Sequence, residues 1–160
     1  MSATAPGDLS IRPLSSLDDR ERCAQLMASS EPWITLGRGY DAALRILSDP
    51  TRETCIASLD DIFAGFLILN MKGAFAGYIQ TICIAPEHRN RGLGRRLIAF
   101  AEERIFRESP NVFLCVSSFN SDARRLYERL GYELIGELRD YLVRGSSELL
   151  MRKTIGPLQA

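Results

Sequence analysis

The sequence predicts an α+β fold in which about four helices flank one central sheet of about seven strands. Two observations predict it. Segments with helical periodicity alternate with apolar, partly β-branched runs, and three of those runs follow one another directly. The 160 residues suffice for a buried core, and no repeat, low-complexity segment or linker divides them. We therefore expect a single domain over residues 1–160.

The N-terminal third is expected to form one strand and two helices. Residues 9–14 read as the strand, and the first helix is expected over residues 18–29. Its apolar side chains can share one face: Leu17, Cys23, Ala24 and Met27. Residues 29–40 break this pattern with a proline and two glycines, and a short helix follows at 41–47.

Three antiparallel strands are expected next. Residues 53–59 and 62–70 are separated by Asp60-Asp61, which is typical of a hairpin. A turn near Lys72-Gly73 leads to the third strand at 77–85, where Pro86 stops it.

Helices and strands alternate through the rest of the chain. Apolar residues recur every four positions after Gly92, so a helix is expected to begin there: Leu93, Leu97, Ala101 and Ile105. The remaining elements are a strand at 111–117, a helix capped by Asn120 and stopped by Gly131, and strands at 132–138 and 146–153 joined near Gly145.

Composition excludes several classes of function. The net charge is zero, which disfavours nucleic-acid binding, because such affinity comes mostly from neutralising phosphates. The longest apolar stretch, at 62–69, is too short to span a bilayer, and "MSATAPGD" does not resemble a secretory signal. We expect a cytoplasmic protein with no membrane partner. The four cysteines form no CxxC pair, so we expect buried free thiols and no metal site.

A local basic segment, "EHRNRGLGRR" at 87–96, points to a small anionic ligand. The expected helix start offers unpaired N–H groups, the glycines allow close approach, and the arginines add charged donors for phosphate. Neither the nucleotide P-loop nor the dinucleotide fingerprint matches, since no Gly-Lys-Ser/Thr is present and the third glycine is missing after Gly94. The alternative is a helix start with merely solvated arginines. We expect His88 to be a surface residue.

Two motifs in this region resemble the GNAT superfamily of acetyl-CoA-dependent N-acetyltransferases. The segment 89–94 matches its pyrophosphate signature, Arg/Gln-x-x-Gly-x-Gly/Ala, and follows a strand that ends in a proline. The second motif is "NSDARRLYERLGY", with Asn120, Ala123, Leu126, Tyr127 and Gly131 in the family's spacing. The resemblance covers about residues 53–153.

The resemblance implies a mixed, mostly antiparallel sheet that splays between its fourth and fifth strands. Acetyl-CoA would lie in the resulting slot, and an amine acceptor would enter from the opposite side. By resemblance the cofactor contacts are Ile82, Cys83 and Ile84 for the pantetheine arm, Arg89, Asn90, Arg91, Gly92, Leu93, Gly94 and Arg95 around the pyrophosphate, and Asn120 beside the arm.

Tyr127 would stand beside the thioester sulfur and act as the general acid. A phenol with a pKa near 10 can protonate a departing thiolate whose reference pKa is about 8.5. Each motif residue also has a purely structural interpretation: Asn120 as a helix cap, and Tyr127 as a core tyrosine.

The expected base is missing. Some relatives carry a glutamate at the position of Gln80 and others at that of Cys115. A lysine amine is neutral in fewer than about 1 in 1,000 molecules at pH 7, whereas an α-amine is neutral in roughly one in ten. We therefore predict a low-pKa amine or a water relay, with Glu31, Asp140 and Tyr141 as the fallback bases.

The acceptor site is expected around Glu31, Trp33, Gln80 and Tyr141. Trp33 either walls that pocket or anchors the 29–40 loop to the core. The predicted function is transfer of acetyl to a primary amine of a small molecule or a protein or peptide N-terminus, in a monomer or a homodimer. The alternative is a binding module that senses acyl-CoA without turnover.

Overall fold

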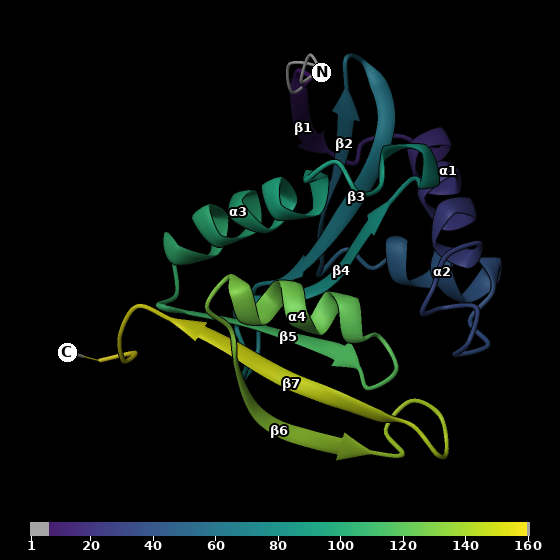
Figure 1. Ribbon diagram of the computed structural model, residues 1–160. Coiled ribbons are helices and arrows are strands. Elements are labelled where there is room, and N and C mark those ends of the chain that lie inside the picture. The colour runs from purple at the N-terminus through teal and green to yellow at the C-terminus, as the bar shows by residue number, and fades with distance from the viewer. Residues whose placement is uncertain (1–6, 160) are drawn as a thin grey trace, which may run out of the picture.

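The computed structural model describes residues 7–159, which form one sheet covered by helices on both faces (Figure 1). Residues 1–6 and Ala160 lie outside this range. The expectation that the chain has no secretory signal rests partly on those first six residues. The elements in chain order are β1 (Leu9–Pro13), α1 (Leu17–Ala28), α2 (Tyr40–Leu47), β2 (Glu53–Leu59), β3 (Ile62–Asn70), β4 (Tyr78–Ile84), the short 3₁₀ helix η1 (Pro86–His88), α3 (Leu93–Phe106), β5 (Asn111–Ser117), α4 (Ser121–Arg129), β6 (Glu133–Arg139) and β7 (Ser147–Thr154). The expected element order is confirmed, with boundaries shifted by about one residue.

The seven strands form one sheet in the order β1-β2-β3-β4-β5-β7-β6. All neighbours are antiparallel except β4 and β5, which are parallel. The expectation of a mixed, mostly antiparallel sheet with four flanking α-helices is therefore confirmed.

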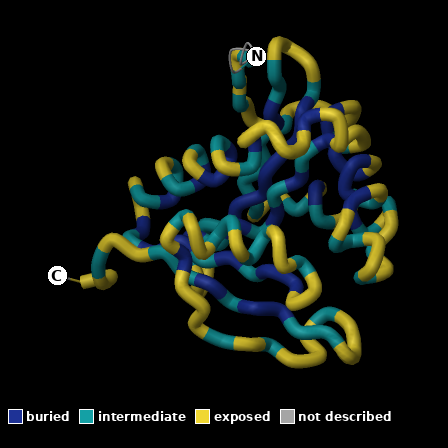
Figure 2. Tube along the Cα trace, in the orientation of Figure 1, coloured by how far each residue is buried: buried dark blue, intermediate teal, exposed yellow. Residues whose placement is uncertain are grey.

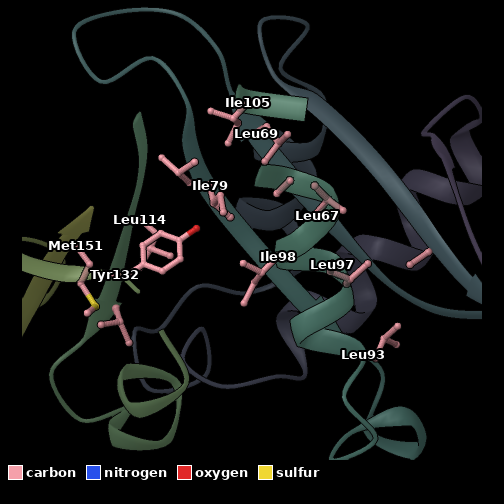
Figure 3. Packing of buried hydrophobic residues seen from close by; sticks show 14 of the residues in the cluster. Leu67, Leu69, Ile79, Leu93, Leu97, Ile98, Ile105, Leu114, Tyr132 and Met151 are labelled. Atoms are coloured by element: carbon pink, nitrogen blue, oxygen red, sulfur yellow. The ribbon is translucent and has the colours of Figure 1, made fainter. Parts of the chain in front are cut away.

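Strand β3 lies at the centre of the core and is buried on both faces. Its successive side chains alternate, so that Leu67 and Leu69 pack against α3 while Phe66 and Ile68 pack against α1 and α2. The core thus has two clusters, an α3 cluster on one face of the sheet and an α1–α2 cluster on the other. Figure 3 shows Leu93, Leu97 and Ile98 of α3 in the α3 cluster. Truncating a fully buried leucine such as Leu97 to alanine lowers the free energy of unfolding by about 2–5 kcal/mol in comparable cores. Strand β6, at the rim of the sheet, is mostly exposed (Figure 2).

The sheet separates between β4 and β5. Only two residue pairs join these strands, Tyr78 with Phe113 and Ile79 with Leu114. Beyond them β4 continues to Ile84 and β5 to Ser117 without pairing to one another. The predicted splay between the fourth and fifth strands is therefore confirmed.

A β-bulge lies at the point of separation. Leu69 of β3 pairs with Ile79 and Ile68 pairs with Thr81, so Gln80 is the extra residue of β4. A bulge bends a strand and increases its local twist. Residues 79 and 83 are four apart and would share one face of a regular strand. The bulge between them reverses the alternation, so that Ile79 packs in the α3 cluster whereas Cys83 packs in the α1–α2 cluster.

Two sequence expectations need correction. His88 is buried rather than exposed, because η1 folds the chain back directly after β4, and neither ring nitrogen has a hydrogen-bond partner among residues 7–159. All four cysteines are free, but only Cys23 and Cys83 are buried. Cys55 and Cys115 are half-buried.

Candidate functional site

A cleft of about 430 Å³ opens where β4 and β5 separate. Its walls come mainly from β4, β5, α4 with its N-cap, and the connections that join α1 to α2 and β6 to β7. Single residues of α1, α2, β3, β7 and the segment before β2 complete them. Its lining is Met27, Glu31, Pro32, Trp33, Leu36, Arg38, Ile46, Arg52, Asn70, Tyr78, Ile79, Gln80, Thr81, Ile82, Leu114, Cys115, Val116, Ser117, Asn120, Ala123, Tyr127, Tyr141, Leu142 and Glu148. The loss of strand pairing thus creates a space that segments far apart in the sequence share.

The structure brings seven of the predicted site residues together in this cleft: Glu31, Trp33, Gln80, Ile82, Asn120, Tyr127 and Tyr141. The fallback base Asp140 is not among its lining residues, and its Oδ1 accepts a 2.6 Å hydrogen bond from the Gly145 N–H within the β6–β7 turn. The predicted residues Cys83, Ile84 and 89–95 also lie outside the lining. Cys83 instead packs into the core on the α1–α2 side.

The N-terminus of α3 presents a set of unpaired backbone donors. Gly92 caps the helix with φ of +77°, and no side chain caps it. The first backbone bond of the helix runs from the Arg96 N–H to the Gly92 carbonyl, at 3.2 Å. The N–H groups of residues 93–95 therefore have no hydrogen-bond partner among the described residues, which is the arrangement that binds phosphate.

These donors are held close to the cleft by the end of β4. A Cβ added at Gly94 would lie 3.3 Å from Cδ1 of Ile84, so α3 packs directly on this strand. Ile84 lies two residues beyond Ile82, which lines the cleft, and this separation is about 7 Å along a strand. A Cβ at Gly92 would meet nothing within 4 Å, so the loop there is open to a ligand.

The arginines of this loop divide into two pairs. Arg89 donates to the Ile84 carbonyl at 2.9 Å and to Ser30 Oγ at 3.1 Å, and Arg96 donates to the Gly7 carbonyl at 3.1 Å. Arg91 and Arg95 are exposed, and neither forms an ion pair or hydrogen bond within residues 7–159. The first pair fixes the loop, and the second pair is available to an anion.

Helix α4 carries the second predicted motif into the cleft. Asn120 Oδ1 accepts a hydrogen bond from the Ala123 N–H at 3.3 Å, so the predicted cap is present while the residue also lines the cleft. At the other end, the N–H groups of Gly131 and Tyr132 bond the carbonyls of Glu128 and Tyr127, which confirms the glycine stop.

Tyr127 is half-buried and lines the cleft. Burial raises the pKa of its phenol, so the group stays protonated at neutral pH. A buried phenol that keeps its proton can donate it to a nearby anion.

Gln80 and Cys115 occupy the two positions at which some relatives carry a glutamate. Each of these side chains contacts another residue of the cleft. Gln80 Oε1 accepts a 2.7 Å hydrogen bond from Arg52 Nε. The Cys115 thiol lies beside the Tyr78 phenol, and burial raises the pKa of both groups. At physiological pH Gln80 is an uncharged amide and Cys115 is a protonated thiol. Neither position therefore supplies a carboxylate to the cleft.

Trp33 lies between the core and the cleft. It packs against the α1–α2 core cluster and also lines the cleft. Glu31, two residues earlier, is exposed, and its Oε2 accepts a 3.2 Å hydrogen bond from the Thr35 N–H.

Sequence reasoning missed Glu148, Ser117 and Arg38. All three line the cleft, and Ser117 Oγ donates a 2.6 Å hydrogen bond to Glu148 Oε1. Burial raises the pKa of Glu148, against the opposing effects of the Ser117 hydrogen bond and the Arg38 charge. The available signal was an acidic residue inside the strand "SSELLMRK", next to Leu149, which enters the core.

Residues 17–132 match the family model described as the acetyltransferase (GNAT) family. The chain belongs to the GNAT acetyltransferase family. It is 30% identical over 146 residues to the N-alpha-acetyltransferase RimI of Mycobacterium tuberculosis, covering 86% of this chain and 88% of that protein. The resemblance inferred from the two motifs is thereby confirmed.

Two further comparisons agree with this assignment. An uncharacterized protein of Mycobacterium leprae is 31% identical over 146 residues, and the match covers 84% of this GNAT chain but only 38% of that longer protein. A structure of a GNAT-family protein from Desulfovibrio desulfuricans superposes with a TM-score of 0.75 at 20% identity, over 93% of this chain and 100% of the other.

Residues 7–159 of this GNAT protein lack two further features. None of the helices there combines the length and apolar character that a bilayer crossing demands. Within the same range, no group of three or more histidine, cysteine, aspartate or glutamate side chains is placed to hold a metal ion.

Proposed function

We propose that this protein transfers an acetyl group from acetyl-CoA to a primary amine by direct attack in a ternary complex. The observation that carries the proposal is the shared cleft, in which Asn120 and Tyr127 of α4 meet the unpaired part of β4. The acyltransferase family supports this chemistry.

The donor would extend from the cleft to the N-terminus of α3. The unpartnered N–H groups of residues 93–95 and the side chains of Arg91 and Arg95 suit its pyrophosphate. The backbone of Ile82, Cys83 and Ile84 would run beside its pantetheine arm, and the Asn120 amide nitrogen is available there, since only Oδ1 is used in the cap. Acetyl-CoA supplies the activated acyl group, and these residues orient it.

Tyr127 would donate its proton to the sulfur that leaves. Burial raises the pKa of this phenol and so keeps its proton in place for transfer at neutral pH. A backbone N–H of β4 beyond the bulge would polarise the thioester carbonyl, as an oxyanion site requires.

The acceptor would be a primary amine that enters past Trp33, Glu31 and Tyr141. The name of the mycobacterial relative, an N-alpha-acetyltransferase, supports an α-amine such as a peptide N-terminus. The cleft of about 430 Å³ also has room for a small amine. Both small amines and peptide N-termini should therefore be assayed as acceptors.

Two measurements test this function. Acetyl-CoA at a hundred times its Kd should stabilise the fold by about 2.7 kcal/mol, whereas ATP and NADH at equal concentration should not. Thiol release is then followed with polyamines, amino acids, aminoglycosides and N-terminal peptides. Equal stabilisation by all three nucleotides would contradict the donor assignment. Selective acetyl-CoA binding without turnover of any amine would instead support the sensing module.

A further inference from the structure

Glu148 is the buried carboxylate of the cleft. It lies on β7, where its neighbours Leu149 and Met151 enter the core on the α3 side, so Glu148 points to the opposite face. Only 6% of its surface is exposed. A carboxylate is almost never buried to this degree unless it is paired, because transfer of its charge out of water is costly.

The described residues pair this carboxylate only in part. Ser117 Oγ donates to Oε1 at 2.6 Å across the β5–β7 ladder, where Ser117 and Glu148 are register partners. No ion pair and no other side-chain hydrogen bond joins the Glu148 carboxylate to any residue in 7–159. An ionised carboxylate offers about four acceptor sites, so most of its capacity is left for a donor that enters through the cleft.

Four residues that line the cleft lie close enough to interact with the Glu148 carboxylate. They are Tyr78 of β4, Cys115 and Ser117 of β5, and Arg38 of the α1–α2 connection. The Glu148 charge raises the pKa of both Tyr78 and Cys115, which places it near both side chains. Arg38 attracts it but forms no hydrogen bond with it. Tyr78 and Cys115 are both uncharged at physiological pH, because burial raises the pKa of each.

We propose that Glu148 binds the ammonium group of the acceptor and accepts the proton that the amine must lose before it attacks. This assignment rests on the proposed acetyl transfer. It supplies from β7 the carboxylate that β4 lacks at Gln80 and β5 lacks at Cys115, and it replaces the water relay expected from the sequence.

The proton balance closes with the residues present. Glu148 takes one proton from the ammonium and leaves a neutral amine, whose nitrogen then forms the C–N bond at the thioester carbonyl carbon. As the C–S bond breaks, the Tyr127 proton goes to sulfur, and the phenol recovers a proton from the amine nitrogen. The third proton stays on the amide, and the carboxyl of Glu148 releases its proton to solvent.

Glu148→Gln is the decisive variant, because glutamine keeps the shape and still accepts from Ser117. The chain provides a matched control in Glu137→Gln on the adjacent strand β6. Glu137 Oε1 also accepts a serine hydroxyl, that of Ser147 at 2.7 Å, but Glu137 does not line the cleft. Glu137 is exposed, so this control reports the effect of neutralising a serine-bonded, cross-strand glutamate outside the cleft.

For Glu148→Gln we expect an acetyl-CoA Kd within about twofold of the wild type and a kcat/KM for the acceptor about 100-fold lower at pH 7. The wild-type rate should fall on acidification with an apparent pKa above the usual glutamate value of 4.5, and this limb should be absent in the variant. Glu137→Gln should keep both the rate and the limb. A Glu148→Gln enzyme within about threefold of wild type, with its acid limb intact, would overturn the proposal.

A binding measurement separates this inference from the proposed function. CoA-loaded protein is titrated with n-butylammonium and with an alanine-initiated tripeptide amide, and chemical shifts of the cleft residues are followed. Saturable shifts in wild type and in Glu137→Gln, lost in Glu148→Gln, would support the ammonium site even if no amine is acetylated. Equal shifts in wild type and Glu148→Gln, or none in the wild type, would overturn it.

Discussion

The rings of Tyr127 and Tyr132 meet edge to face with their centroids 5.9 Å apart, yet their hydroxyls have different environments. The Tyr132 hydroxyl donates to Glu102 Oε1 at 3.0 Å, and Lys153 Nζ completes that cluster at 3.0 Å from Glu102 Oε2. The Tyr127 hydroxyl forms no hydrogen bond with a residue in 7–159, and Tyr127 is one of the residues that line the cleft. The Tyr132 phenol is thus bonded within the fold, whereas the Tyr127 phenol has the unused donor that our proposed acid role requires.

Tyr127→Phe should therefore lower kcat by about 100-fold or more while the Kd for acetyl-CoA changes little, because only proton donation is lost. Steady-state thiol release and calorimetry measure the two quantities. Tyr132→Phe is the matched control and should reduce the free energy of unfolding by about 1–3 kcal/mol with little effect on kcat. A Tyr127→Phe enzyme that binds acetyl-CoA as poorly as it turns over would contradict the acid role.

Replacing Arg91 and Arg95 together with alanine should weaken CoA binding about 100-fold or more, because the loss of each charge-assisted hydrogen bond to phosphate costs about 1.5–3 kcal/mol of binding free energy. Calorimetry with CoA and with pantetheine, which lacks the phosphates, measures this. Affinity for pantetheine should be unchanged. An equal loss for both ligands would show that the arginines act on the fold of the loop instead.

Gly77→Ala should be strongly destabilising because this residue holds β4 against β5 where the two strands still pair. Gly77 has φ of +91°, and an added Cβ would lie 2.5 Å from the Asn111 carbonyl oxygen. Backbone strain and overpacking together predict a loss of roughly 2–5 kcal/mol in unfolding free energy.

Gly73→Ala provides the comparison for that change. Gly73 has a similar φ of +85° but nothing within 4 Å of an added Cβ, so only the strain of about 1–2 kcal/mol applies. Urea denaturation of both variants measures the difference. Equal losses would show that the contact with β5 does not constrain Gly77.

Asp19→Asn should lower stability at neutral pH and have a smaller effect in acid. Arg12 donates to both oxygens of buried Asp19 at 2.7 and 2.8 Å, and this bonding holds the pKa of the carboxyl well below its usual value of 3.8, against the opposing effect of burial. A lowered folded-state pKa contributes stability above pH 3.8 that is lost as the pH falls through the folded value.

Melting temperatures recorded from pH 7 down to pH 2 test this sign. The difference between wild type and Asp19→Asn should shrink below pH 3.8. Asp18→Asn is the control, since Asp18 is exposed in its 3.2 Å pair with Arg22 and should change the melting temperature little. A constant difference for Asp19→Asn across the range would contradict the assigned pKa.

The strands and helices could be predicted because their signals are local. Apolar runs such as 62–70 and the four-residue periodicity after Gly92 follow from the burial of one segment at a time, and each appears in the fold within about one residue. The Asn120 cap and the Gly131 stop are local as well. They depend on backbone groups only a few residues away.

The candidate site could be predicted only in part, because its remaining residues depend on pairing between distant strands. The bulge at Gln80 arises from the register of β3 against β4, which no local pattern specifies. Glu148 reads as an outward polar residue of a strand. Its burial follows from β5 lying beside it and from the α1–α2 turns covering that face. His88 is buried for a similar reason, since the sequence places it in a basic loop that tertiary packing folds inward.

The separation of β4 from β5 places two unprotected strand edges inside the molecule instead of at its rim. Backbone groups of β4 beyond Ile79 that face this gap have no ladder partner, which is the condition under which sheets recruit an added extended segment. The arm of CoA carries amide groups and can act as that added strand, so the donor would serve as part of the architecture as well as a reactant. Hydrogen exchange of β4 and β5 should then slow together when CoA binds, as the two half-sheets become one.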